Sequence, residues 1–203
     1  MTRNITSTKK SNKNGDSIRK HHRYRRFRRG SYELIVEILD SLPTAFSDAI
    51  VIVLHRNSKY ETKIESSLSK RLNRNVISVR DKLPILGNHI YFAPPGYHTL
   101  VEPDHIFSLD ISDPVQFSRP SIDVFFESVA AVYGKHATAF ILSGANNDGS
   151  EGIKTLINYG AVCYVQNPQE AVIETMPQAG MQSSKKVKVL SNQQIIDYFS
   201  QLT

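Results

Sequence analysis

Short apolar runs rich in β-branched residues alternate with segments of helical periodicity, and this pattern constrains the fold most strongly. The clearest runs are residues 49–54, 138–142 and 161–165. Strands of a parallel sheet have this composition when helices cover both faces. Apolar residues at helical spacing over 34–42, closed by Pro43, show the second pattern. We predict an α/β fold with a doubly wound, mainly parallel sheet and helices on both faces.

The weaker patterns complete this outline. The 105–109 segment alternates apolar and polar residues, which indicates a hairpin strand. Further short strands are predicted over 76–79 and 89–93. Further helices are predicted over 61–72, after Ser121, and over 150–159, 177–181 and 192–202.

Positive charge is concentrated at the N-terminus. Residues 1–30 contain 11 Lys and Arg and one acid, Asp16, whereas residues 31–203 contain 14 Lys and Arg and 18 acids. Residues 1–20 are polar and lack apolar periodicity, which predicts disorder. We expect a basic tail over 1–29 and a folded domain over 30–203.

Several protein classes are excluded or disfavoured. No apolar run approaches the ~20 residues of a membrane span, and no secretory leader is evident, so we expect a cytoplasmic protein. The single cysteine, Cys163, cannot form an internal disulfide and lies in an apolar run. We expect it to be a small buried hydrophobe in a reducing compartment.

Two polar residues follow predicted buried strands. His55 follows the 49–54 run, and Asp148 lies in the loop after the 138–142 run. Sites in open α/β sheets form at the carboxyl ends of strands. A carboxylate there could fix the imidazole tautomer of a general base. From spacing alone, a capping role for the histidine is the commoner case.

Five motifs occur in order and carry a resemblance. They are Val-Ile-Val-Leu-His ending at His55, the segments 91–98 and 119–123, Leu-Ser-Gly-Ala-Asn-Asn-Asp-Gly at 142–149, and Gln-Asn-Pro at 166–168 with Met-Pro-Gln-Ala at 176–179. Over roughly residues 30 to 200 the chain resembles the catalytic domain of the bacterial chemotaxis protein-glutamate methylesterase family. That family hydrolyses methyl esters of chemoreceptor glutamates, and deamidates glutamines, with a Ser-His-Asp triad.

The resemblance implies roles for individual residues. His55 would be the general base and Asp148 its orienting carboxylate. His98 and Arg119 fall in motifs near the cleft, where the alternative is structural, with His98 bonding a turn and Arg119 bridging to an acid or a carbonyl. Gly144 and Gly149 would serve tight turns and close backbone approach.

The resemblance also sets expectations about the loop and the partners. Asn146 departs from the family, which usually has glycine there, and this could alter the loop. No metal or organic cofactor is implied, and no receiver domain is expected. The implied partners are cytoplasmic helices of methyl-accepting chemoreceptors, and a methyltransferase or receiver-domain protein. Neither specific nucleic acid nor a membrane span is expected.

The family nucleophile is missing from the written chain. The family serine lies in a Gly-x-Ser-x-Gly-type turn before the first helix, and the corresponding position here is Phe27/Arg28. The preceding residues, which should form a buried strand, are rich in arginine, and each unpaired buried guanidinium costs several kcal/mol. Ser31 lies beyond the turn and suits a helix N-cap better.

A frameshift explains the missing serine. Residues 21–29 can be encoded CAT CAT CGT TAT CGG CGG TTC CGC CGG, and reading one nucleotide later gives Ile-Ile-Val-Ile-Gly-Gly-Ser-Ala-Gly. That segment is a β-branched strand and the nucleophile turn, with the serine codon straddling Phe27 and Arg28. We hypothesise that a sequencing error or gene decay corrupted this first strand.

Two other functions stay open. A decayed esterase could still dock receptor helices without catalysis. Alternatively, residues 1–30 could bind nucleic acid or an anionic membrane, with Tyr24 and Phe27 stacking on bases. For the chain as written, the lost serine predicts an impaired enzyme.

Overall fold

A computed structural model describes residues 31–56 and 63–203. The predicted tail over 1–29, its frameshifted strand and the nucleophile position at Phe27/Arg28 lie outside the described residues. Within the described part, no helix combines the length and apolar composition needed to cross a membrane.

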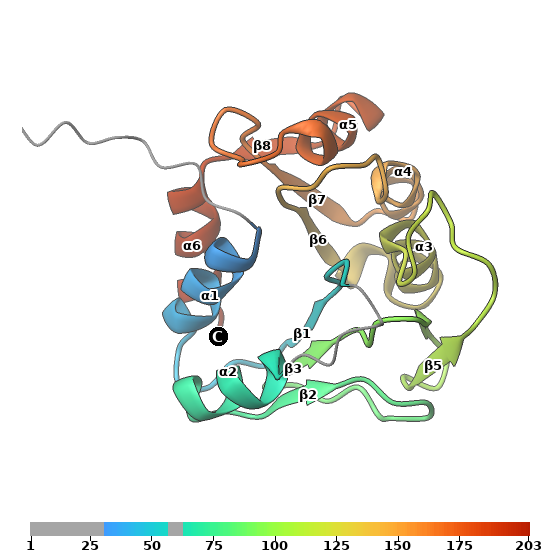
Figure 1. The fold of residues 1–203 in the computed structure, drawn as a ribbon. Coiled ribbons are helices and arrows are strands. Elements are labelled where there is room, and N and C mark those ends of the chain that lie inside the picture. Colours follow the sequence, from blue (N-terminus) through green and yellow to red (C-terminus); the bar gives the residue numbers. More distant parts are fainter. Residues whose placement is uncertain (1–30, 57–62) are drawn as a thin grey trace, which may run out of the picture.

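Two three-stranded parallel sheets form the centre of the molecule (Figure 1). The first has the order β1 (Ala49–Ile52), β3 (His89–Phe92), β2 (Val76–Ser78). The second has the order β6 (Thr138–Ile141), β7 (Val162–Gln166), β8 (Lys188–Leu190). All four strand pairings in these sheets are parallel, which confirms the predicted α/β fold.

Helices cover both faces of the first sheet. Along β1, Ile50 and Ile52 join the apolar cluster of α1 (Ser31–Ser41) and α2 (Ile64–Leu72). Ala49 and Val51 instead join the cluster of α3 (Ile122–Tyr133) and α4 (Ser150–Asn158). This division follows from the alternation of side chains along a strand. The remaining described helices are the 3₁₀ turn η1 (Gly134–His136), α5 (Thr175–Ser183) and α6 (Asn192–Ser200).

The strand order reverses between the two sheets. In the first sheet β1 and β2 are the two edges and β3 lies between them, whereas the second sheet runs outward from β6 to β8. The strands β1 and β6 line the same cavity, so they are the inner edges of the two sheets. Doubly wound folds bind ligands at the point where the strand order reverses. The loops after β1 and β6, which contain His55 and Asp148, lie at this point.

The structure corrects the expected environment of β1. We predicted a strand buried on both faces, but all four β1 residues are only half-buried. The reason is that β1 is a sheet edge within the described residues and borders a large apolar cavity. Cys163 is buried as expected, and desolvation raises its thiol pKa to about 11.

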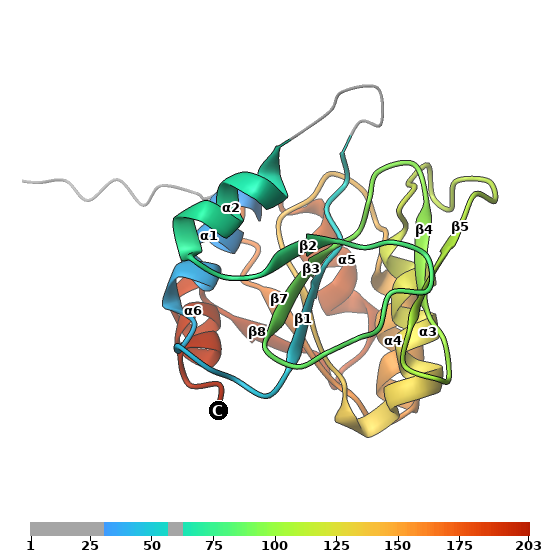
Figure 2. The same ribbon diagram turned by 90° about the horizontal axis from the view of Figure 1, so that it is seen from below.

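Two strands were not predicted from the sequence. The partner of the predicted hairpin strand β5 (Phe107–Asp110) is β4 (His98–Val101), which lies beside α3 (Figure 2). Its first two residues, His98 and Thr99, are polar yet fully buried, so its composition does not read as a core strand. The three-residue β8 is too short to show periodicity.

Candidate active site

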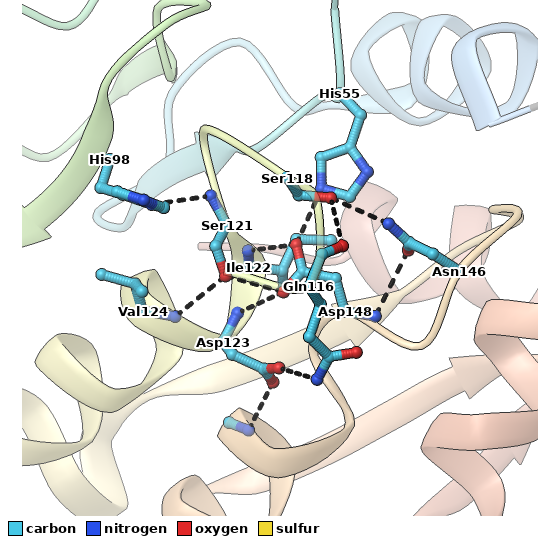
Figure 3. Close-up of polar contacts among 11 residues, drawn as sticks. His55, His98, Gln116, Ser118, Ser121, Ile122, Asp123, Val124, Asn146 and Asp148 are labelled. Carbon is cyan, nitrogen blue, oxygen red and sulfur yellow. Dashed lines mark hydrogen bonds and ion pairs between the residues drawn. The ribbon is translucent and has the colours of Figure 1, made fainter. Parts of the chain in front are cut away.

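His55 and Asp148 meet across the boundary between the two sheets (Figure 3). The Nε2 atom of His55 lies 2.8 Å from Oδ2 of Asp148. The Asp148 side chain is fully buried, whereas the His55 side chain is 30% exposed. An ionised carboxylate accepts hydrogen bonds only, so Nε2 carries the proton and Nδ1 keeps a free lone pair. This arrangement fits a histidine that works as a base toward a bound substrate.

The N-terminus of α3 holds the Asp148 carboxylate. Oδ2 accepts a hydrogen bond from the Ile122 N–H at 2.7 Å. Oδ1 accepts from the Asp123 N–H at 2.9 Å and from the Ser121 hydroxyl at 2.8 Å. Backbone N–H groups without partners and the helix dipole both favour an anion at this position. The N-terminus of α3 therefore fixes the position of the Asp148 carboxylate independently of its contact with His55.

These contacts decide the ionisation of Asp148. Burial is the largest single influence and would raise the pKa of the carboxyl. The hydrogen bonds from His55, from the Asp123 and Ile122 N–H groups and from Ser121 together outweigh it, so the pKa lies below its usual value. Asp148 is thus a permanent anion at neutral pH, as the orienting member of a His–Asp pair must be.

His98 binds the residue that precedes α3, and that residue in turn binds Asp148. Its buried ring accepts the Ser121 N–H at Nδ1, at 3.2 Å, and donates from Nε2 to the Asp113 carbonyl at 3.1 Å. Ser121 in turn caps α3 and binds Asp148. The structure therefore places His98 against the turn, separated from Asp148 by Ser121.

Arg119 holds the preceding loop. Its Nη1 donates to the carbonyl oxygens of Ile111 and Ser112 at 2.7 and 2.8 Å. Its own carbonyl accepts the Gly96 N–H. Arg119 thus bridges to carbonyls, and the contacts described for it reach neither His55 nor Asp148.

Both predicted glycine positions allow close approach. A Cβ atom on Gly144 would lie 2.5 Å from Cε of Met176. Gly149 has φ +97°, and a Cβ atom there would lie 2.5 Å from Cδ1 of Ile141 and 2.9 Å from Cγ2 of Ile122. These two glycines let the Asp148 loop pack closely against side chains of α5, β6 and α3.

Replacing Gly149 by Ala is expected to lower the free energy of unfolding by about 3 kcal/mol, from left-handed strain plus the core clash. Gly160→Ala is a matched control, because its φ of +88° is similar but its nearest new contact, Cβ of Lys135, is 3.3 Å away. The control should lose only about 1 kcal/mol. Urea unfolding of both variants measures the difference, and equal losses would contradict the clash argument.

A polar bridge between two loops lies beside Asp148, and it was not predicted from the sequence. Asn146 accepts the Asp148 N–H at 3.3 Å and donates to the Ser118 hydroxyl at 2.8 Å. Gln116 donates to the Asp123 carboxylate at 2.9 Å. The backbone of Asn146 does not have positive φ, so asparagine suits this loop without strain. No local pattern reveals the bridge, because its members lie in separate loops.

An aromatic side chain projects beside this bridge. Gln116 and Phe117 both have positive φ, and Phe117 is fully exposed. Hydrogen bonds between Val115 and Ser118 close the turn. The exposed ring is thus carried on a turn that Ser118 ties to the Asp148 loop.

Across residues 31–56 and 63–203, no serine hydroxyl hydrogen-bonds to His55. Ser31, the nearest serine to the expected nucleophile position, is the first residue of α1 itself.

The fold and the His–Asp pair at the point of strand reversal define an α/β enzyme domain. The family model described as CheB methylesterase matches residues 29–199. The crystal structure of the Thermotoga maritima CheB methylesterase catalytic domain shares the fold, with a TM-score of 0.71 at 23% identity, covering 84% of this chain and 92% of that one.

Sequence relatives agree with this assignment. A protein from Leptospira interrogans is 38% identical over 173 residues, which is 85% of this chain and 90% of the relative. A protein-glutamate methylesterase/protein-glutamine glutaminase from Hydrogenovibrio crunogenus is 34% identical over 151 residues, or 73% of this chain and 40% of the relative. The chain belongs to the CheB methylesterase family, a hydrolase family of chemotaxis.

Proposed function

We propose that this domain is built to hydrolyse methyl esters of chemoreceptor glutamates, with His55 as general base and Asp148 as its orienting carboxylate. The observation that carries the proposal is the 2.8 Å contact between the exposed imidazole and the buried, multiply hydrogen-bonded carboxylate. Relatives whose names include both methylesterase and glutaminase support the ester or amide of a glutamyl side chain as the substrate.

The reaction follows acyl-transfer chemistry. Nδ1 of His55 takes the proton of a serine hydroxyl while the oxygen attacks the glutamyl ester carbonyl, and main-chain N–H groups at the glycine turns hold the oxyanion. Collapse of the intermediate breaks the bond to methoxide, which leaves as methanol with the proton from His55. Water then attacks the acyl-enzyme, gives its proton to His55, and releases glutamate and the serine hydroxyl.

The turn that Ser118 ties to the Asp148 loop suits a protein substrate. Phe117 offers a large apolar surface on a constrained turn, and the hydrogen bonds of Arg119 hold the chain that leads to it. An exposed aromatic residue on a pre-ordered turn loses little conformational freedom when it binds a partner. The proposed partner is the cytoplasmic helical surface of a methyl-accepting chemoreceptor, which also implies cytoplasmic action.

The written chain is proposed to be an impaired enzyme, because the family serine does not occur at Phe27/Arg28. Its kcat for methanol release from a methylated receptor should be about a million-fold below that of a serine-containing relative. A release assay with radiolabelled methyl groups, with the Salmonella typhimurium relative as positive control, measures this. Turnover comparable to the control would show that another residue supplies the nucleophile.

The absent serine also favours a second candidate, a receptor-binding module without catalysis. Receptor binding by the written chain without methanol release, in the same assay mixture, would support it. Nucleic-acid binding through residues 1–30 predicts a steep salt dependence of affinity that is lost when those residues are deleted.

A further inference from the structure

The chain that carries His55 runs beyond the end of its strand. β1 ends at Ile52, and the Ile52 carbonyl accepts the Ala93 N–H at 2.9 Å. Between described residues, the backbone hydrogen bonds found outside helices and strands do not involve residues 53–56. The described hydrogen bond of the His55 ring goes to Asp148, in the loop after β6. Side-chain contacts must therefore fix this segment against the first sheet.

Arg56, the residue after His55, binds the end of the neighbouring strand β3. Its Nη2 atom donates a hydrogen bond to the Ala93 carbonyl at 3.0 Å. Its guanidinium carbon lies 5.9 Å from the centre of the Phe92 ring, within the range of a cation–π contact. Phe92 and Ala93 are fully buried where β3 ends. The Arg56 side chain thus ties the chain beside His55 to the first sheet, at a point where the backbone pairing of β1 and β3 has ended.

Helix α2 supplies the counterion for Arg56. The same Nη2 atom lies 2.7 Å from Oε1 of Glu65, in the first turn of α2. A hydrogen bond between two charged groups is stronger than a neutral one, and the helix dipole favours a carboxylate in the first turn. The Arg56 side chain is 6% exposed and the Glu65 side chain 15% exposed, so salt screens the pair only weakly. One guanidinium group therefore joins the chain beside His55, the end of β3 and the start of α2.

Stability alone gives little reason for this ion pair. Taking two charges out of water is costly, and replacing a buried ion pair by apolar residues is often neutral or stabilising. A buried pair does fix geometry, because both partners must keep their orientation to stay paired. Arg56 and His55 are consecutive, but Arg56 binds the first sheet whereas His55 binds the Asp148 loop of the second. A backbone held at Arg56 leaves the imidazole little room to move away from Asp148.

We propose that Arg56, through its ion pair with Glu65, is a positioning residue that keeps the His55 ring within hydrogen-bond distance of Asp148. The described contacts of the guanidinium group go to the first sheet and to α2, so it acts on the imidazole through the backbone. The inference rests on the proposed function only for the role of His55 as the base. The position of the ring is a property of the folded chain, and it can be measured without turnover.

Solvent exchange of the His55 Nε2 proton tests the proposal in the full written chain. NMR with ¹⁵N-labelled histidine measures how fast this proton leaves its hydrogen bond with Asp148, and His55→Gln identifies the signal by removing it. Arg56→Ala should speed the exchange by about tenfold. Arg56→Lys keeps a cation for Glu65 and should return the rate to within about threefold of the wild type. An exchange rate that Arg56→Ala leaves unchanged would overturn the proposal.

Arg71→Ala is the matched control for Arg56→Ala. Arg71 also forms an ion pair of α2, with Asp40 of α1, but this pair is exposed, at 58% and 38%. Its loss should leave the exchange rate of the His55 ring within about twofold of the wild type. An equal rise in the control would show that any loosening of α2 frees the ring, and it would overturn the specific role of Arg56.

A double variant, Arg56→Met with Glu65→Leu, separates positioning from folding. An apolar pair replaces the buried ion pair, so the melting temperature should stay within about 3 °C of the wild type. Exchange of the His55 ring should still rise by about tenfold, which a merely structural role of the pair does not predict. Slow exchange in this variant would show that packing suffices, and it would overturn the proposal.

The same measurements keep this proposal distinct from the proposed function. Faster exchange in Arg56→Ala and in the double variant supports the positioning role whether or not the domain hydrolyses esters. If a chain to which the family serine has been restored shows this faster exchange but releases no methanol, the positioning role stands and the proposed function is overturned.

Discussion

In a repaired chain, in which Ile-Ile-Val-Ile-Gly-Gly-Ser-Ala-Gly replaces residues 21–29, His55→Gln is expected to lower kcat for methanol release by about a million-fold. This is the loss found when a serine hydrolase loses its base. The stability should change by less than about 1 kcal/mol. The His55 side chain is 30% exposed and its one described hydrogen bond goes to Asp148, which a glutamine amide can still supply. Single-turnover methanol release and urea unfolding measure the two effects.

Two further variants, a serine variant and a double variant, test this prediction. Replacing the new serine by alanine in the repaired chain should remove as much activity as His55→Gln, because serine and histidine act as one unit. The double variant should be no slower than either single variant. Two results would contradict the assignment of His55 as the base. One is a loss of kcat in the double variant that combines the losses of both single variants. The other is a kcat of the repaired chain that is slow and that His55→Gln does not change.

Asp148→Asn is expected to lower the free energy of unfolding by about 3 kcal/mol at pH 7, in the written chain as well as in the repaired one. The carboxylate accepts four hydrogen bonds, and the amide keeps only one acceptor atom. The NH₂ group would face N–H donors of α3 in a fully buried position. In the repaired chain kcat should also fall by about ten-thousand-fold, because the imidazole loses its orienting partner.

The stabilisation that ionised Asp148 gives to the folded chain is expected to decrease as pH falls. The pKa of Asp148 is lower in the folded chain than in the unfolded chain, so the unfolded state binds its proton first as pH falls. The stabilisation is complete above the unfolded value of about 4 and is lost as pH falls through the folded pKa. The stability difference between the wild type and Asp148→Asn should therefore shrink toward acidic pH. A difference that stays constant down to pH 2 would contradict the lowered pKa.

Asp123→Asn is the matched control. Burial, the largest influence, raises the pKa of Asp123, and repulsion from Asp148 adds to it although the Gly152 N–H opposes it. The ionised form is therefore penalised, and a neutral amide can still accept the 2.7 Å hydrogen bond from the Gly152 N–H. The Gln116 amide, which now donates to the second carboxylate oxygen, can turn over and accept from the new NH₂ group. We expect less than about 1 kcal/mol of change at pH 7. Equal losses at both positions would show that any change at this helix terminus is costly.

Local patterns predicted the elements that carry their own signal. The helix predicted after Ser121 begins at Ile122, and the structure shows that the Ser121 hydroxyl caps it by accepting the Val124 N–H. Continuous apolar runs predicted β1, β6 and β7 because a buried strand needs apolar side chains on both faces. β4 could not be predicted in the same way, since its buried His98 is satisfied by partners 15 and 23 residues away.

The residues alone established the α/β class and that His55 and Asp148 follow two different strands, because hydrophobic periodicity and order along the chain are local properties. The 2.8 Å contact between them, the Asn146–Ser118 bridge and the burial of His98 were decided by tertiary structure. Each of these depends on loops that the chain brings together only when the sheets and helices pack. The apolar cavity that borders β1 belongs to the same category, because β6, which also lines it, is 86 or more residues away from β1 in the sequence.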